Sequence, residues 1–168
     1  GENGGNVDLG ETPIGRVFRI GHDGSATTEK TGIAISNTFC WSPDATKFYT
    51  GDTMLNAINV WDYDVATGRI SNERPFFTGF DRGLPDGSAM DVDGYLWNAR
   101  YGGSCVVRVA PDGSVDRVID MPVNAVTTCT FGGPDLKTLY ITTAGGGIGM
   151  EKGEQLAGGL FALGADRV

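Results

Sequence analysis

Apolar and polar residues alternate over many short segments of this chain, and each segment is bounded by Gly, Asp, Asn or Pro. The run Val115-Asp116-Arg117-Val118-Ile119 shows the two-residue period that is typical of a strand with one buried face. No segment keeps the helical period beyond about two turns. The pattern therefore predicts an all-β protein, with strands over residues 16–20, 47–50, 57–63, 95–99, 105–110, 114–119, 125–131, 139–143 and 159–163.

A repeat organises these strands. A turn with an aspartate leads into an aromatic-rich strand three times, at spacings of 49 and 42 residues, with Asp44, Asp93 and Asp135. A second hairpin turn alternates with it at spacings of 41 and 48 residues, with Asp23, Asp64 and Asp112. Two interleaved turns with a period in the forties are typical of the four-stranded blades of a β-propeller. We expect all six aspartates to serve the turns themselves.

The repeat amounts to about three and a half blades, from half a blade before Ser36 to a last strand at 159–163. A propeller needs at least about 4 blades to close its ring and remove the exposed sheet edges. We therefore expect residues 15–168 to form the C-terminal part of a single propeller domain. Residues 1–14 form a Gly-rich segment that precedes the first predicted strand, and we assign it as a loop or lid.

The charge balance narrows the range of partners. The chain has 13 Lys and Arg against 21 Asp and Glu, and its formal net charge is -8. Without a basic cluster, this balance argues against a nucleic-acid partner or an anionic membrane, and it suits a metal cation or a neutral polar substrate. No apolar run approaches the ~18 residues of a membrane span. No signal peptide is visible, so the predicted location is cytoplasmic.

Thiol and imidazole chemistry is not favoured by the sequence. The three cysteines, Cys40, Cys105 and Cys129, lack metal-site spacing and lie among apolar residues, so we expect buried thiols in a reducing compartment. His22 is the only histidine and lies in a turn, which leaves little for a serine triad or a multi-histidine metal site.

Two polar residues stand where inner strands of neighbouring blades should begin. Asn37 lies inside an apolar strand, and Asp86 lies in Leu84-Pro85-Asp86-Gly87, directly ahead of the corresponding strand. They are 49 residues apart, which is one blade period, so both side chains should converge on the propeller axis. Amide and carboxylate oxygens are hard ligands that suit Ca²⁺ or a similar ion. The alternatives remain that the Pro-Asp-Gly run is only a turn and that Asn37 only ends a strand.

Three further residues carry simpler expectations. Trp41 and Trp97 occupy equivalent positions in the repeat, so we expect both to pack in the core. Arg100 follows a predicted inner strand, and we expect its side chain at the surface, with the channel entrance as the alternative.

Seven segments together form a recognisable series: ISNTFCWSPD at 35–44, VWDYD with TG at 60–68, LPDG at 84–87, GYLWNA at 94–99, TTCTFGGPD at 127–135, LYITTA at 139–144 and LAGGLF at 156–161. In order and spacing they resemble the SMP-30/gluconolactonase/LRE-like family of regucalcin-like lactonases. The resemblance extends from about residue 15 to residue 163 and corresponds to the C-terminal half of the family's proteins.

The resemblance implies a six-bladed β-propeller with one divalent metal ion in the channel, calcium in first place and zinc, manganese or magnesium as alternatives. Asn37 matches a metal-ligand asparagine, and Asp86 matches a ligand aspartate that also acts as general base. The implied activity is the hydrolysis of a small-molecule lactone, in which a metal-activated water attacks the lactone carbonyl. The implied partner is the missing N-terminal half of the propeller or a complementing chain.

Some features keep other interpretations open. The family usually has Gly-Leu after the asparagine, whereas this chain has Thr38-Phe39, a change that narrows the expected pocket. Glu2, Asn3 and Glu11 lie in the Gly-rich segment, which is interpreted as a lid over the site or as a plain linker. A calcium-binding regulatory propeller without turnover, and a related propeller hydrolase of organophosphate esters, are the alternative functions.

Overall fold

Strands make up nearly all regular structure in the computed structural model, which describes residues 13–145 and 155–164. One 3₁₀ turn, η1, covers Thr53–Leu55. The strands are β1 Gly15–Ile20, β2 Ala26–Ile33, β3 Ser36–Trp41, β4 Lys47–Asp52, β5 Ala57–Asp64, β6 Arg69–Thr78, β7 Leu84–Met90, β8 Leu96–Tyr101, β9 Cys105–Val109, β10 Val115–Asp120, β11 Val126–Gly132, β12 Thr138–Thr143 and β13 Leu160–Leu163. The prediction of an all-β chain is confirmed.

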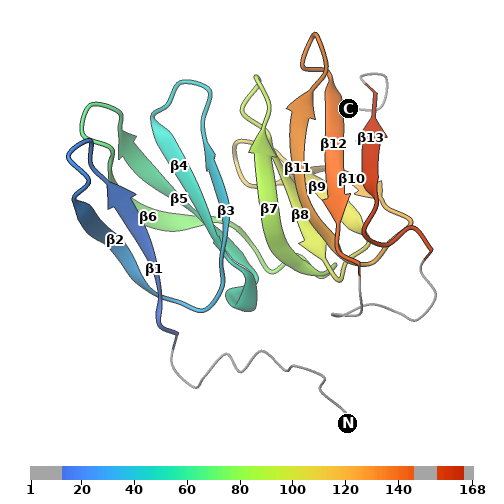
Figure 1. The fold of residues 1–168 in the computed structure, drawn as a ribbon, viewed down its shortest axis with the longest axis horizontal. Coiled ribbons are helices and arrows are strands. Elements are labelled where there is room, and N and C mark those ends of the chain that lie inside the picture. The colour runs from blue at the N-terminus through green and yellow to red at the C-terminus, as the bar shows by residue number, and fades with distance from the viewer. Residues whose placement is uncertain (1–12, 146–154, 165–168) are drawn as a thin grey trace.

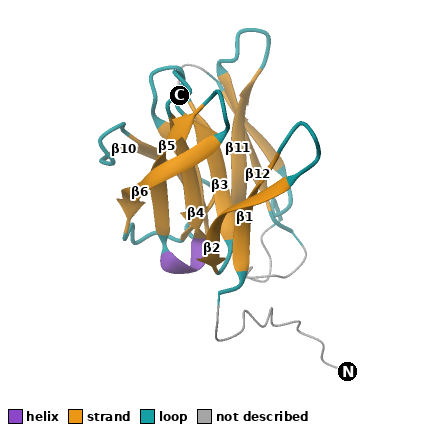
Figure 2. Cartoon of the chain, turned by 90° about the vertical axis from the view of Figure 1, so that its left-hand side faces the viewer, coloured by secondary structure: helices purple, strands orange, loops and turns teal. Residues whose placement is uncertain are grey.

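The strands form antiparallel sheets that follow one another along the chain, as expected for propeller blades (Figures 1 and 2). Two sheets have four strands, in the orders β3-β4-β5-β6 and β7-β8-β9-β10. Among the described residues, β1 and β2 form a two-stranded sheet before them, and β11, β12 and β13 form a three-stranded sheet after them. The estimate of three and a half blades therefore agrees with the structure.

Two strands were not predicted, and a third was assigned as a loop. Most positions of β2 and β6 are exposed or half-buried, since these strands lie at the outside of their sheets and present no regular apolar face. The segment before residue 90 was expected to lead into a strand, whereas Leu84–Met90 is itself strand β7. Pro and Gly residues hid this strand because both are rare in a regular ladder.

Apolar side chains fill the two spaces between neighbouring blades. The first layer joins the β3–β6 sheet to the β7–β10 sheet and consists of Cys40, Tyr49, Ile58, Val60, Phe77, Leu96, Val107 and Val109. The second joins the β7–β10 sheet to the β11–β13 sheet and consists of Trp97, Ala99, Val106, Val123, Val126, Cys129, Leu139 and Ile141. The middle sheet is thus buried on both faces, which explains why five of the six positions of β8 are buried.

The first strands of the three larger sheets lie side by side, with β7 between β3 and β11 (Figure 1). The approach of β7 to β11 requires a glycine. A Cβ atom on Gly87 would lie 2.1 Å from Thr128 Oγ1 and 2.4 Å from Thr128 Cβ, so a larger residue would separate the strands. This contact fixes the spacing of the inner strands on which the candidate site residues lie.

The turn aspartates behave largely as predicted. Asp23, Asp44, Asp64, Asp112 and Asp135 each accept a backbone N–H two residues further on. In the remaining turn the acceptor is Asp91 rather than the predicted Asp93, because Asp91 Oδ1 binds the N–H groups of residues 93 and 95. Five of the six assignments to turn chemistry are therefore correct.

The cysteines and tryptophans show how the repeat places its side chains. All three cysteines are free and buried, and burial raises the pKa of Cys40 and of Cys129 to about 12. Trp97 is 0% exposed, as predicted, whereas Trp41 is 44% exposed. The two positions are also not equivalent, since Trp41 ends β3, the first strand of its sheet, and Trp97 lies in β8, the second strand of the next sheet. The prediction for Trp41 was wrong because no complete blade lies against its face of the sheet within the described residues.

Two further points concern the ends of the chain and the membrane. The assignment of residues 1–14 as a loop or lid, with Glu2, Asn3 and Glu11, falls on residues 1–12 outside the described part, apart from its last two positions. Among the residues that the structure describes, no helix has the length and apolar character needed to cross a membrane.

Replacing Leu96 by alanine tests the first apolar layer. Leu96 is fully buried between two blades, so Leu96→Ala should lower the free energy of unfolding by about 2–5 kcal/mol. The matched control is Leu136→Ala, whose side chain is exposed and should contribute far less. Urea denaturation followed by fluorescence gives both values, and equal losses would contradict the inter-blade packing.

Candidate functional site

Asn37 and Asp86 lie near the starts of neighbouring inner strands, β3 and β7, at points where the strand pairing is irregular. In β3 the register shifts between Asn37 and Phe39, and in β7 it shifts between Pro85 and Ser88. Such bulges turn side chains out of the regular alternation and are frequent next to active sites. Asp86 therefore lies within a bulged strand, and the expectation that it precedes the strand is corrected.

Two threonine hydroxyls connect these strands. Thr38 Oγ1 donates to the backbone carbonyl of Asp86 at 2.7 Å, and Thr53 Oγ1 donates to the carbonyl of Pro85 at 2.8 Å. The amide nitrogen Nδ2 of Asn37 in turn donates to Thr53 Oγ1 at 2.9 Å. The structure thus places the segments that carry Asn37 and Asp86 against each other, and the convergence of the two side chains on the propeller axis stays a prediction.

Thr38 adopts an unusual backbone conformation. Its φ is 54°, in the left-handed region that a β-branched residue rarely enters and that costs on the order of 1–3 kcal/mol. Glycine, which the resembling family usually has here, takes this φ without strain. A Cβ on the facing Gly51 would lie 3.1 Å from Thr38 Cβ, so that glycine leaves room for the larger residue. The hydroxyl bond to the Asp86 carbonyl helps to hold Thr38 in place.

Asn98 and Arg100 support the bulge of β7 from inside the blade. Asn98 is fully buried, and its Nδ2 donates to Ser88 Oγ at 2.9 Å and to the carbonyl of Gly87 at 3.3 Å. Arg100 Nη1 donates to Asn98 Oδ1 at 3.2 Å. Sequence reasoning did not single out Asn98, although one amide inside the apolar run Leu96–Ala99 was a usable signal.

Arg100 is 1% exposed, so its expected place at the surface was wrong. Its guanidinium donates hydrogen bonds to neutral oxygens of Asn56, Phe80, Arg82, Gly83 and Asn98. Burial lowers the pKa of Arg100 to about 10, and the group stays charged at neutral pH. Several of these oxygens belong to the segment between β6 and β7, which the arginine therefore holds in one position.

Burial also affects the Asp86 carboxyl. Its removal from water raises the pKa to about 6, partly opposed by a hydrogen bond from the backbone of Gly87. A carboxylate with this pKa exchanges a proton near neutral pH, which is the range that a general base requires.

The donor set fits a hard divalent cation as far as this chain supplies it. Asn37 offers an amide oxygen and Asp86 a carboxylate, the oxygen ligands that Ca²⁺ and Mg²⁺ prefer. The part of the chain that the structure describes contains no group of three or more His, Cys, Asp and Glu residues suited to one metal ion. An ion bound by Asn37 and Asp86 would therefore need further ligands from outside these two residues.

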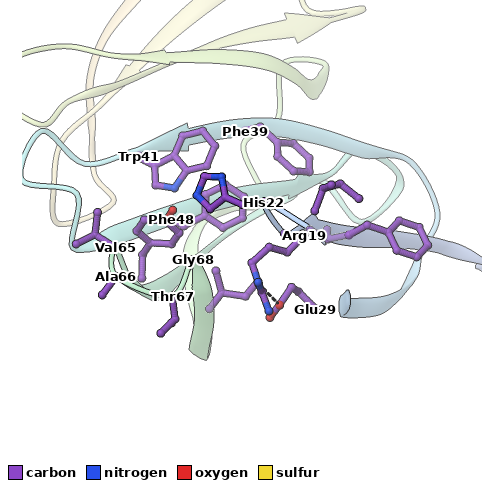
Figure 3. Close-up of a pocket in the computed structure, with 16 residues that line it drawn as sticks. Arg19, His22, Glu29, Phe39, Trp41, Phe48, Val65, Ala66, Thr67 and Gly68 are labelled. Carbon is purple, nitrogen blue, oxygen red and sulfur yellow. Dashed lines mark hydrogen bonds and ion pairs between the residues drawn. The ribbon is translucent and has the colours of Figure 1, made fainter. Parts of the chain in front are cut away.

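A separate groove lies on the first four-stranded sheet, away from Asn37 and Asp86. It has a volume of about 380 Å³ and lies between the β1–β2 sheet and the aromatic side chains Phe39, Trp41, Phe48 and Tyr63 (Figure 3). The ring centroids of Trp41 and Phe48 lie 4.8 Å apart, and Arg19 on β1 and Glu29 on β2 form an ion pair of 2.8 Å within the β1–β2 sheet. His22 lines it, in the turn where the sequence placed it.

Comparison with known proteins identifies related sequences over most of this chain. Residues 2–145 match the family model described as SMP-30/Gluconolactonase/LRE-like region. The chain is 40% identical to pentonolactonase XacC of Haloferax volcanii over 160 residues, which cover 91% of this chain and 55% of that protein. It is 33% identical to regucalcin of Xenopus laevis over 153 residues, covering 89% of this chain and 51% of that protein.

Solved structures give the same result for the fold. A luciferin-regenerating enzyme matches with a TM-score of 0.83 at 31% identity, covering 93% of this chain and 54% of its own. A calcium-binding protein, regucalcin from Agrobacterium tumefaciens, matches with a TM-score of 0.82 at 31% identity, covering 92% and 53%. The chain thus spans about half the length of the relatives that it matches.

Replacing Asp86 by asparagine tests the burial of its carboxyl in the metal-free protein. Because the folded-state pKa of about 6 lies above the ordinary value of 3.8, ionisation disfavours the folded state. This contribution to stability is fully present below pH 3.8 and is lost as the pH rises through about 6. Asp86→Asn should therefore raise the melting temperature at pH 7.5 in the presence of chelator, and much less at pH 4. A loss of stability at pH 7.5 would contradict a desolvated carboxylate.

Proposed function

Because the chain belongs to the SMP-30/gluconolactonase/LRE-like family, we propose that the protein is a divalent-metal-dependent hydrolase of lactones. The observation that carries the proposal is the hydrogen-bonded juxtaposition of the Asn37 and Asp86 segments on neighbouring inner strands. The names of the relatives point to the substrate class, since they include a pentonolactonase and a putative sugar lactone lactonase of Bacillus subtilis.

The roles of this chain's residues follow from their chemistry. Asn37 and Asp86 hold the metal ion through oxygen atoms, and the ion, when bound, supplies Lewis-acid activation of the lactone carbonyl and of water. Asp86 accepts a proton from the attacking water through its carboxylate, which is partly withdrawn from solvent. The hydrogen bonds from Thr38 and Thr53 hold the β7 bulge, which carries Asp86, against β3, which carries Asn37.

A panel of sugar lactones, assayed with and without chelator, tests the proposal. Hydrolysis should require a divalent ion, and Asp86→Ala should reduce kcat by at least about 100-fold through the loss of general-base catalysis. Asp93→Ala is the matched control, since Asp93 is an exposed residue of the turn between β7 and β8, whereas Asp86 lies near the other end of β7. Unchanged turnover in Asp86→Ala would contradict the assignment of Asp86 as the general base. Metal binding without turnover of any lactone would instead favour a calcium-binding regulatory propeller.

The aromatic groove supports a second element of the proposal, concerning the rest of the propeller. Among the described residues, the β1–β2 sheet has two strands, whereas the β3–β6 sheet beside it has four, and Trp41, which lines the groove between them, is 44% exposed. In both inter-blade layers the inner strands of one sheet cover those of the next. Two further strands, from the same polypeptide or a complementing chain, would cover Trp41 in the same way. Relatives of nearly twice this length are consistent with such strands.

Tryptophan accessibility tests the coverage of the groove. The chain has 3 tryptophans, and Trp61 and Trp97 are buried. Acrylamide should therefore quench mainly Trp41 in the 168-residue chain, and Trp41→Phe should remove most of that quenching. In a protein that includes the additional strands, quenching should fall to the level of the Trp41→Phe variant. Equal quenching in both proteins would contradict coverage by further strands.

A further inference from the structure

Thr53 connects the two candidate ligand segments. It begins η1, is 7% exposed, and its hydroxyl contacts both the Asn37 amide on β3 and the Pro85 carbonyl on β7. We propose that Thr53 is a positioning residue that turns the amide oxygen of Asn37 away from the protein and toward a metal ion. The inference deepens the proposed function and rests on it.

The argument depends on how many hydrogens a hydroxyl has. A backbone carbonyl only accepts hydrogen bonds, so the single hydrogen of the Thr53 hydroxyl is used on Pro85. Toward Asn37, the Thr53 oxygen is then only an acceptor, and the amide must present its NH₂ end at 2.9 Å. If the amide were reversed, Asn37 Oδ1 would face Thr53 Oγ1, and neither oxygen would have a hydrogen to donate. Asn37 Oδ1, the atom that ligates a cation, is thus left on the opposite side.

Thr53 itself is held firmly. Its backbone N–H donates to the carbonyl of Ile35 at 3.1 Å, immediately before β3. Asp52 caps η1 by accepting the N–H of Met54 at 3.2 Å, and its other oxygen accepts the N–H of Ala34 at 3.0 Å. The start of η1 and the entry to β3 therefore move as one unit, which fixes the distance from the Thr53 hydroxyl to the Asn37 amide.

The arrangement couples the two ligand segments. Because the Pro85 carbonyl belongs to β7, the direction of the Thr53 O–H depends on β7 lying against β3. The same contact, with the bond from Thr38 to the Asp86 carbonyl, positions the Asp86 bulge. The orientation of one ligand and the position of the other are thus set by the same packing of β7 on β3.

Calcium affinity, measured by titration calorimetry, tests the proposal independently of turnover. Thr53→Val keeps the shape but removes the hydroxyl, and it should weaken Ca²⁺ binding by about 10–100-fold, as is typical when the partner that orients a ligand is lost. Thr53→Ser keeps the hydroxyl and should restore most of the affinity. Thr50→Val is the matched control, because it removes a buried hydroxyl of the same blade that accepts a hydrogen bond from Trp61, whereas the Asn37 amide donates to Thr53.

A double variant separates positioning from general destabilisation. If Thr53 acts through Asn37, then Thr53→Val should cause little further loss of Ca²⁺ affinity in an Asn37→Ala background. The proposal would be overturned if Thr53→Val lowered Ca²⁺ affinity by the same factor in both backgrounds. It would also be overturned if Thr53→Val and Thr50→Val lowered that affinity equally.

Nuclear magnetic resonance of the metal-free protein distinguishes failure of this inference from failure of the proposed function. Nuclear Overhauser effects should connect the side-chain NH₂ of Asn37 to Thr53, and Thr53→Val should accelerate exchange of those amide hydrogens with solvent. Absence of that connection in the wild-type protein would overturn the inference even if lactones are hydrolysed. The nuclear Overhauser effect between Asn37 and Thr53 and the expected Ca²⁺ affinities of the variants could be observed while no lactone is hydrolysed. In that case the inference stands and the hydrolase proposal fails.

Discussion

Across the boundary between the first two complete blades, the backbone carbonyls of Pro85 and Asp86 accept hydrogen bonds from the hydroxyls of Thr53 and Thr38. Bulged strands leave some backbone groups without partners in the ladder, and buried carbonyls without partners are costly, by about 1–3 kcal/mol each. Here side chains of the neighbouring blade supply the donors. The same bonds bring the Asn37 and Asp86 segments together, so the site depends on this blade contact.

The inside of the β7–β10 blade provides a rigid support for that contact. Arg100 is buried against neutral oxygens, and it orients Asn98, which binds the backbone and side chain of the β7 bulge. An arginine buried without a carboxylate is stabilised only if most of its donors are used, and the five residues around it meet that requirement. A polar network inside an otherwise apolar blade thus determines where the Asp86 carboxylate lies.

Much of the architecture could be predicted from the sequence alone, because hairpin turns and alternating strands are local features. The two aspartate turns recur at nearly constant spacing, and that spacing predicted the blades and the equivalence of Asn37 with Asp86. Strands β2 and β6 were missed since outer strands carry no apolar stripe, and β7 was missed since Pro and Gly interrupt it. The exposure of Trp41 could not be predicted from the sequence either, because it depends on which sheet lies against this side chain.

The sequence by itself determined the all-β class, the repeat and the two candidate ligands, all of which follow from residue type and spacing along the chain. Only the tertiary structure decided that Thr38 takes a left-handed φ, that Arg100 is buried, and that Thr53 binds both Asn37 and Pro85. These features depend on contacts between residues that are distant in sequence, such as the 32 positions that separate Thr53 from Pro85. The direction of a hydroxyl hydrogen is set by the acceptor that packing brings to it, and residue type alone does not specify that acceptor.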